Sequence, residues 1–331
     1  MKLELGKPII HCYPIHLHHF SIINKNKKYE PWLYSNYIQI STPPELPYDR
    51  HKIINFFRYD EQEPFYGGTS PFMKECKLER IETIDEIVPS FRESINQDKY
   101  MNIFVDDYYL PFRRAYRKNH YPHDLFLFGY TDEKRVFHVL GFDQYGLPKE
   151  YEVDYQVLSK AYLSVNSLLK SEYSESNWMA CDYQMHYTDA ECELEIPRMV
   201  QLYQSFIDSI PFDQMPWAIN GAAVYPLLME YYYQYYNSLT AYDHRPFHML
   251  YEHKMLMLKR VDYIQKELDL DLTPIRPRFS KLCQDFLDLR NFFMKNNIRA
   301  VKLSPNQFNQ KMDALIDKEL DLYTSIVKIL K

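Results

Sequence analysis

The sequence predicts a two-domain protein of the α+β class. We expect an α+β N-terminal domain at residues 1–170, a linker at 171–194 and an all-helical C-terminal domain at 195–331. Apolar residues alternate with a period of two in several segments of the first half, whereas later they recur with the 3.6-residue period of a helix. A polar stretch rich in Ser and Glu separates the two patterns. The chain has 331 residues, 46% of them apolar, which suits about two domains.

Strands and one helix are expected in the first hundred residues. Residues 34–40 alternate like a strand, and three prolines between residues 41 and 47 predict a loop. Thr83 precedes a helical pattern at 84–95 whose first turn holds two acids, which favours a capped helix start. Residues 100–105 are again typical of a strand.

The clearest element is a hairpin in the middle of the chain. Residues 123–130 and 135–142 are both apolar and aromatic, and a polar stretch from Thr131 to Lys134 separates them. This pattern predicts two antiparallel strands joined by a short turn. A helix is expected to follow from about Tyr155 to Lys170.

The second half reads as helices that mostly begin near a proline, the residue favoured in the first turn. The predicted helices span residues 197–210, 221–240, 246–268, 277–296 and 305–331. Short loops between long helices indicate an antiparallel bundle. The chain also has 31 Tyr and 13 Met, more than one core of this size needs. Because these residues are enriched at interfaces, we expect a homodimer formed through the helices.

Composition narrows the function. The net charge is −6 and we find no basic block beyond Lys25, Lys27 and Lys28, so a nucleic-acid partner is not expected. Only seven glycines argue against a phosphate-cradling loop. Five unevenly spaced cysteines favour reduced thiols, and no apolar run of ~18 residues or secretory signal is found. We therefore expect a cytoplasmic protein that does not enter a membrane.

Cys12 is a candidate nucleophile. It ends an apolar run and precedes Pro14 by two residues, which places it near a helix N-terminus. That position lowers a thiol pKa and offers backbone N–H groups to an oxyanion. The alternative is a buried, inert cysteine, which is the usual state of a free thiol.

His123 and Asp143 are candidate partners of Cys12. His123 opens the first strand of the hairpin, and Asp143 follows the second. If the hairpin is centred on Glu133, the two side chains lie opposite each other on one face, about 5 Å apart at Cβ. This register requires a loop of odd length, since a slip by one residue would separate them. A carboxylate beside an imidazole supports the ion pair that a Cys–His site needs. The alternative is that both are ordinary polar residues at strand ends.

Two motifs carry a resemblance to a known family. The stretch Val105-Asp106-Asp107-Tyr108-Tyr109-Leu110-Pro111 and the stretch from His120 to Tyr130, which ends in Gly-Tyr, resemble the N-terminal domain of butirosin-type acyltransferases. That family is related to papain-like, bacteriocin-processing cysteine peptidases. The resemblance covers roughly residues 8–165. The chain departs from it in having no Gln shortly before Cys12 and an unusual sequence after it.

The resemblance implies a papain-like fold for the N-terminal domain and a site made of Cys12, His123 and Asp143. It implies that Cys12 takes an acyl or peptidyl group from a carrier-protein thioester and passes it to an amine, in thiotemplated antibiotic biosynthesis. The partners would be the carrier protein and the amine acceptor. No cofactor is implied beyond the carrier's phosphopantetheine arm. With water as acceptor the same residues would make a peptidase or thioesterase, and without activity the domain would be a binding scaffold.

Other clusters of His, Cys, Asp and Glu could form alternative sites. His11, His16, His18 and His19 surround Cys12, but they fit a wet helix face better than a metal site. The spacing of His244, His248 and Glu252 suits a metal or, more commonly, a solvated stripe. Cys181 and Cys192 lack a partner pair, and the consecutive Asp106 and Asp107 face opposite sides of a strand. We therefore predict no metal site.

Overall fold

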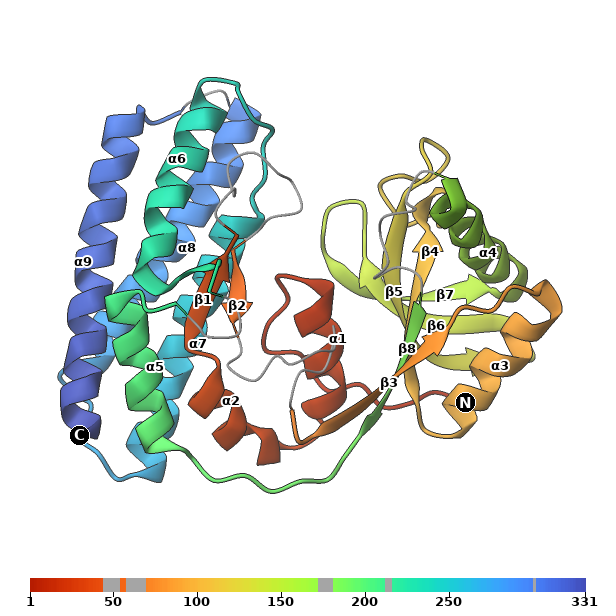
Figure 1. Ribbon diagram of the computed structural model, residues 1–331, viewed down its shortest axis with the longest axis horizontal. Coiled ribbons are helices and arrows are strands. Elements are labelled where there is room, and N and C mark those ends of the chain that lie inside the picture. The colour runs from red at the N-terminus through yellow and green to blue at the C-terminus, as the bar shows by residue number, and fades with distance from the viewer. Residues whose placement is uncertain (44–53, 58–69, 172–180, 212–215, 300–301) are drawn as a thin grey trace. The chain divides into compact units, whose positions relative to one another are not determined.

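A computed structural model of the chain describes residues 1–43, 54–57, 70–171, 181–211, 216–299 and 302–331 (Figure 1). The chain divides into two compact units. Unit 1 comprises residues 1–29 and 63–191, and unit 2 comprises residues 30–62 and 192–331. Neither unit is a continuous segment of the sequence, because residues 30–62 belong with the C-terminal half.

Unit 1 is built on a six-stranded sheet in which all neighbouring strands are antiparallel. The strand order is β3-β8-β4-β5-β6-β7. The strands are β3 (Met73–Glu79), β4 (Tyr100–Asp106), β5 (Pro122–Thr131), β6 (Val136–Phe142), β7 (Pro148–Asp154) and β8 (Cys181–Tyr187). β8, which comes last in the chain among the strands of this sheet, therefore lies between β3 and β4, inside the sheet.

Helices cover both faces of this sheet (Figure 1). On one face, Phe91 of α3 (Ile84–Asn96) contacts Phe137 of β6, with ring centroids 5.9 Å apart, and α4 (Tyr155–Ser171) packs beside it. On the other face, His18 of α1 (Pro14–Ile23) stacks on Phe126 of β5 at 4.8 Å. Phe126 pairs with Leu140, which alternates with Phe137 along β6, so α1 lies opposite α3 and α4.

The hairpin of β5 and β6 forms at the predicted place. Phe126 pairs with Leu140, so at this end the numbers of paired residues sum to 266, which is the register inferred for His123 and Asp143. A β-bulge just before Gly129 shifts the pairing by one residue, and the connecting loop is not odd in length. The predicted register is therefore reached through the bulge, since an extra residue in one strand offsets the pairing.

Unit 2 combines a small antiparallel sheet with helices. The sheet order is β2-β1-β9, formed by β2 (Asn55–Phe57), β1 (Gln39–Thr42) and β9 (Ile219–Asn220). The helices are α2 (Glu30–Asn36), α5 (Ile196–Asp208), α6 (Val224–Tyr236), α7 (Arg245–Glu267), α8 (Arg276–Arg299) and α9 (Pro305–Leu330). Short 3₁₀ helices add Lys27–Tyr29 (η1) and Asp107–Tyr109 (η3) to unit 1 and Gly221–Ala223 (η5) to unit 2.

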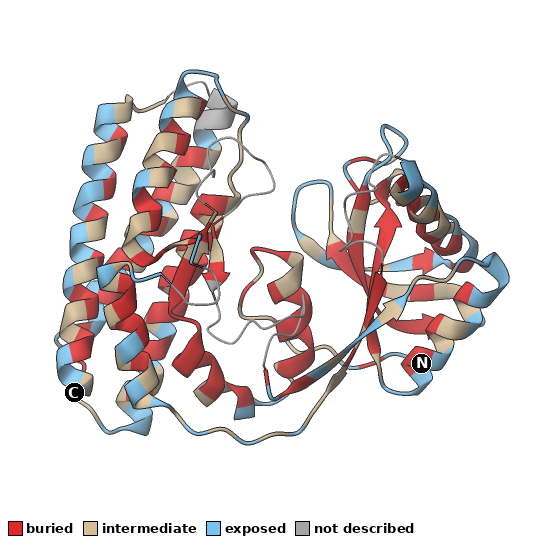
Figure 2. Cartoon of the chain, viewed as in Figure 1, coloured by how far each residue is buried: buried red, intermediate tan, exposed pale blue. Residues whose placement is uncertain are grey.

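The helices of unit 2 are amphipathic, as the 3.6-residue pattern predicts. Figure 2 shows that α9 is buried along one side and exposed along the other. This helix begins with a capping box, in which Ser304 and Gln307 satisfy each other's backbone N–H groups. On α6, Tyr231, Tyr232 and Tyr235 are buried while their neighbours face solvent. Much of the tyrosine content thus fills the core of unit 2, and the homodimer remains a prediction.

The core of unit 2 contains a fully buried ion pair between Lys254 of α7 and Glu319 of α9. Tyr225 donates a hydrogen bond to Glu319 and accepts one from Lys254 at 2.8 Å. Lys254 also lies 2.9 Å from Nδ1 of His253, whose Nε2 donates to the carbonyl of Ile38 at 2.8 Å. Buried charges are costly unless they are paired and hydrogen-bonded, and here each one is.

The structure is of the α+β class, with a helical C-terminal region, and it corrects several predicted elements. Residues 34–36 belong to α2, so the strand expected at 34–40 begins only at Gln39. Residues 181–187, expected within the linker, form β8. Unit 2 is not all-helical, because it includes the three-stranded sheet. The proline-rich loop lies mostly outside the described residues.

The helices predicted at 84–95 and 155–170 and the strand predicted at 100–105 are confirmed. Thr83 is the residue before α3, but its hydroxyl donates to the side chain of Glu86 at 3.0 Å instead of capping a backbone N–H. Among the described residues, no helix combines the length and apolar character needed to cross a membrane.

Candidate functional site

A pocket of about 550 Å³ lies at one end of the sheet in unit 1. Three strands meet there: β4 ends at Asp106, β5 begins at Pro122 and β6 ends at Phe142. The segment between β4 and β5 supplies most of the wall. The lining residues are Asp107, Arg113, Arg114, Ala115, Lys118, Asn119, Tyr121, His123, Phe142 and Asp143. The pocket therefore contains both predicted partners of Cys12 and several charged groups.

His123 is the one imidazole among the described residues that line this pocket. Its Nδ1 lies 2.9 Å from Oδ1 of Asp124, and its side chain is 30% exposed. Burial alone would lower the pKa of His123, but the hydrogen bond and charge of Asp124 outweigh it and raise this pKa above the ordinary value. No hydrogen bond to Nε2 is found among the residues that the structure describes, so this atom is left to the pocket.

Asp124, rather than Asp143, is thus the carboxylate that orients His123. Successive strand residues normally point to opposite faces, yet the ring of His123 reaches the side chain next to it. This is possible because β5 begins only one residue earlier, at Pro122, where the imidazole lies at the end of the sheet. The sequence reasoning missed Asp124 because it assumed strict alternation up to the last residue of the strand.

Asp143 lines the pocket but bonds elsewhere. Its Oδ1 accepts hydrogen bonds from the backbone N–H groups of Tyr145 and Leu147 at 2.8 and 2.9 Å. Its Oδ2 accepts one from Nζ of Lys149 at 2.7 Å. Burial opposes the charged form, but these three donors hold the pKa of Asp143 below its usual range. Both carboxylate oxygens are therefore used to build the turn after β6, which corrects the role predicted for this residue.

Arg113 ties the pocket wall to the strands. Its guanidinium donates to the carbonyls of Asp124 and Phe142, at 2.7 and 3.1 Å, and Nε lies 3.1 Å from Oδ1 of Asp107. The side chain passes close to Gly141, where an added Cβ would lie 3.1 Å from the guanidinium. A larger residue at position 141 would push the guanidinium of Arg113 away, so Gly141 permits the hydrogen bonds of Arg113 to the two strand carbonyls.

Asp106 anchors the other end of the same segment. It is fully buried, and its oxygens accept hydrogen bonds from the backbone N–H groups of Tyr108 and Tyr121 and from Ser164. The ring of His120 lies 2.6 Å from Oδ2. Burial would raise the pKa of Asp106, but these contacts lower it. Asp106 is therefore a structural carboxylate, and it does not act with Asp107 as a pair of exposed acids.

Cys12 lies two residues before α1, as predicted, and is buried. The direction of α1 follows from its contacts. Lys25, just after the helix, lies 5.0 Å over the ring of Tyr100, at the start of β4. His18 lies over Phe126, further toward the pocket. The N-terminal end of α1 therefore points toward the end of the sheet where β5 begins.

The lengths of α1 and β5 show how far each extends along the sheet. α1 begins at Pro14, four residues before His18, and a helix rises about 1.5 Å per residue, so the helix start lies roughly 6 Å beyond His18 along the helix direction, with Cys12 two residues before it. Three strand residues, or about 10 Å, separate Phe126 from His123 in the same direction. The start of α1 and the start of β5 thus lie toward the same end of the sheet. His123 is an odd number of residues from Phe126, so strand alternation alone would direct it to the face opposite α1. Cys12 is not among the described residues that line the pocket.

The histidines around Cys12 are not a wet helix face. His16, His18 and His19 are all buried. Burial lowers the pKa of His18 to about 4, so this imidazole is neutral near pH 7. His18 is therefore a packing residue of α1. Among the residues that the structure describes, no group of three or more His, Cys, Asp and Glu side chains is arranged to hold a metal ion.

Two lining residues were overlooked in the sequence. Arg114 and Lys118 face the pocket, and with Arg113 and Arg117 they place four cations within six positions. A net charge of −6 summed over the whole chain hides this local cluster of cations, whereas the charge summed over short windows reveals it.

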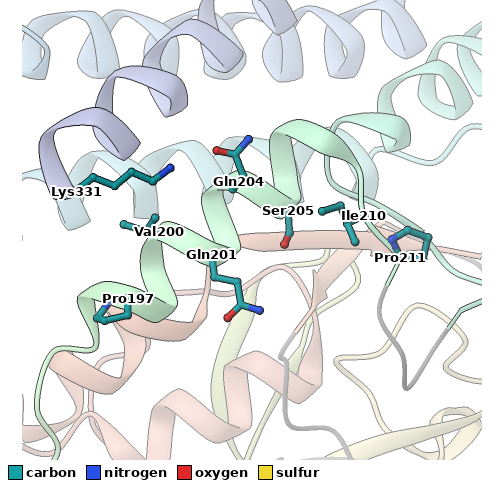
Figure 3. Close-up of a pocket in the computed structure, with 8 residues that line it drawn as sticks. All are labelled: Pro197, Val200, Gln201, Gln204, Ser205, Ile210, Pro211 and Lys331. Carbon is teal, nitrogen blue, oxygen red and sulfur yellow. The ribbon is translucent and has the colours of Figure 1, made fainter.

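Unit 2 contains a separate cavity of about 480 Å³ along α5 (Figure 3). Lys331 reaches over it from the end of α9, and the side chains of α5 that line it include Pro197, Val200 and Gln204. Among the described residues that line this cavity, Lys331 is the one with an ionisable side chain. These lining residues include no acid–base pair and no thiol, so the pocket of unit 1 is the better candidate.

No protein-family model matches this chain, and a search of curated proteins likewise finds no match.

Proposed function

We propose that this chain is a cysteine-dependent acyl or peptidyl transferase with a papain-like site in unit 1. Cys12 is the nucleophile, His123 is its general base and later its general acid, and Asp124 orients the imidazole. The donor is a thioester on a carrier protein and the acceptor is an amine, so the product is an amide, or an ester where a hydroxyl replaces the amine. This assignment follows the resemblance of residues 8–165 to butirosin-type acyltransferases, with the orienting role moved from Asp143 to Asp124.

One observation carries the proposal. The contacts of His18 and Lys25 orient α1 so that its N-terminal end points toward the start of β5, where His123 lies in the pocket. The thiol at a helix start benefits from the helix dipole, which favours the thiolate. An imidazole with a raised pKa and a carboxylate at Nδ1 favours the same ion pair.

The chemistry balances with these groups alone. Nε2 of His123 takes the proton of Cys12, and Sγ attacks the thioester carbonyl. The tetrahedral intermediate expels the carrier thiolate, which takes the proton back from His123, and an acyl-Cys12 thioester remains. The amine then attacks this thioester, His123 takes the proton that the amine loses, and the same proton passes to Sγ as Cys12 leaves as the thiol. Asp124 stabilises the imidazolium in both halves of the reaction.

The test begins with the thiol. Iodoacetamide at pH 6 should label Cys12 faster than the exposed Cys76, because an unassisted thiol has a pKa of about 8.5 and is protonated there. A carrier-bound donor should add an acyl group visible by intact-protein mass spectrometry. The adduct should vanish in Cys12→Ala and persist in the matched control Cys76→Ala. An adduct in Cys12→Ala would refute the mechanism.

Burial of Cys12 favours a second candidate, a binding scaffold without activity. A buried thiol is commonly inert, and Cys12 is only 8% exposed. Under this alternative, iodoacetamide labels Cys12 no faster than Cys76, and no acyl adduct forms. Transfer to water, as in a peptidase or thioesterase, is distinguished by the product, since free acid would accumulate without any amine acceptor.

A further inference from the structure

The charges of the pocket in unit 1 do not cancel. Asp107 is ion-paired with Arg113 inside the wall, and Asp143 is ion-paired with Lys149. These two carboxylates are therefore neutralised by partners of their own. Two lining cations remain, Arg114 and Lys118.

Arg114 and Lys118 are exposed, and neither forms an ion pair with any residue that the structure describes. Arg117 on the same segment differs. It lies over the ring of Tyr116, 5.1 Å from the centroid, and it does not line the pocket. The two unpaired cations are thus directed to the pocket, whereas their neighbour is engaged outside it.

The segment that presents them is fixed in place. Arg113 binds two strand carbonyls, and Asp106 holds the backbone N–H groups of Tyr108 and Tyr121. The backbone that carries Arg114 and Lys118 is therefore held, and it presents a guanidinium and an ammonium to the same pocket. Guanidinium groups bind the paired oxygens of phosphate or carboxylate in a fork, and an ammonium adds a point charge.

We propose that the pocket binds an oxyanionic group of the substrate, a phosphate or a carboxylate, through Arg114 and Lys118. The group would lie in the cavity that His123 also lines, so it would position the reacting end of the substrate beside the imidazole. The identification of this ligand as substrate rests on the proposed function. The binding site itself does not require turnover.

The probe is inorganic phosphate, followed by ¹H–¹⁵N spectra of the histidine side chains. His123→Gln identifies the signal of His123. Phosphate is titrated at constant ionic strength, because salt screens exposed charges. We expect a saturable shift of the His123 signal in the wild-type protein. The double variant Arg114→Gln/Lys118→Gln should weaken the apparent affinity about tenfold or more, since hydrogen bonds to charged groups are lost.

Arg117→Gln is the matched control, because it removes one cation of the same segment that does not line the pocket. The phosphate affinity of Arg117→Gln should stay within about twofold of wild type, as expected for an exposed, screened charge that does not line the pocket. A second titration with acetate distinguishes phosphate from carboxylate. The anion that binds more tightly identifies the oxyanionic group that the pocket prefers. The absence of a saturable shift with either anion, or an equal loss in Arg117→Gln, would overturn the proposal.

The titration is independent of the thiol. Cys12→Ala should bind phosphate as the wild-type protein does, whereas it cannot form an acyl adduct. Anion binding without an adduct in the wild-type protein would remove the transferase and keep the site. An acyl adduct without anion binding would keep the transferase and refute the oxyanion site.

Discussion

His123 and His253 each lie beside a charged residue, and their pKa values shift in opposite directions. His123 in unit 1 is partly exposed and faces a carboxylate, and its pKa is raised. His253 in unit 2 is fully buried, and burial together with the adjacent Lys254 holds its pKa well below the ordinary value. Burial and the sign of the neighbouring charge thus decide whether the pKa of an imidazole is raised, as in His123, or lowered, as in His253.

The same contrast extends to the carboxylates. Asp124 lies beside an imidazole that lines a pocket, whereas Glu319 pairs with Lys254 where solvent does not reach. The first carboxylate is therefore placed where a ligand could meet its partner, and the second is enclosed in the core of unit 2. Substitutions in the two regions should change different measurements.

The largest effect is expected in the ionic core. Glu319→Ala leaves the buried ammonium of Lys254 without its partner, which typically costs about 3–5 kcal/mol of the free energy of unfolding. Chemical denaturation measures this loss. Asp321→Asn on the same helix is the control, since Asp321 pairs with Arg278 at the surface and its removal should change little. A stable Glu319→Ala variant would show that the core is solvated.

The next effect concerns acid. The pKa of His18 is about 4 in the folded protein and about 6.5 when unfolded, so between these values the unfolded chain binds more protons. The stability that neutral His18 contributes is present above pH 6.5 and is lost as the pH falls toward 4. Between pH 7 and pH 5 the loss should be about 2 kcal/mol.

Denaturation at both pH values tests this expectation. In His18→Gln, which cannot titrate, the pH dependence should flatten. His253 shifts in the same direction, so part of the dependence should remain in that variant. An unchanged dependence in His18→Gln would place His18 in contact with solvent.

The smallest effect distinguishes the two carboxylates near His123. Asp124→Asn should lower the pKa of His123, because the negative charge that helps to raise it is lost, although the amide oxygen can still accept a hydrogen bond. Asp143→Asn should leave this pKa nearly unchanged, since Asp143 bonds to Lys149 and to backbone groups. Histidine NMR titrations measure both. A larger shift in Asp143→Asn would restore the role predicted from the sequence.

Local patterns predicted much of the fold. The helices of the second half and the β5–β6 hairpin were found because their periodicity is strong. β8 was missed because its residues are separated from their neighbours β3 and β4 by distant sequence, and pairing of that range leaves no local signal. β7 was missed for another reason, since its charged residues hide the alternation.

The site was predicted in part for the same reason. The helix start near Cys12 is a local feature and is confirmed. The predicted β5–β6 register is met only beyond the bulge, where Phe126 pairs with Leu140, and His123 and Asp143 are not among the described β5–β6 pairs. The pairing of His123 with Asp124 depends on how a strand end is exposed, and the pairing of Asp143 with Lys149 depends on the next turn. Neither contact can be read from spacing alone.

The interleaved units have a consequence for synthesis on the ribosome. β3 leaves the ribosome early but pairs with β8, which is made more than a hundred residues later. Residues 30–62 belong to a unit whose remaining elements begin at residue 192. Neither nascent unit can close early, because β3 emerges before β8 and the β1–β2 pair emerges before β9. Exposed strands of this kind invite chaperone binding, and a fragment that ends near residue 170 would lack the strand inside its sheet.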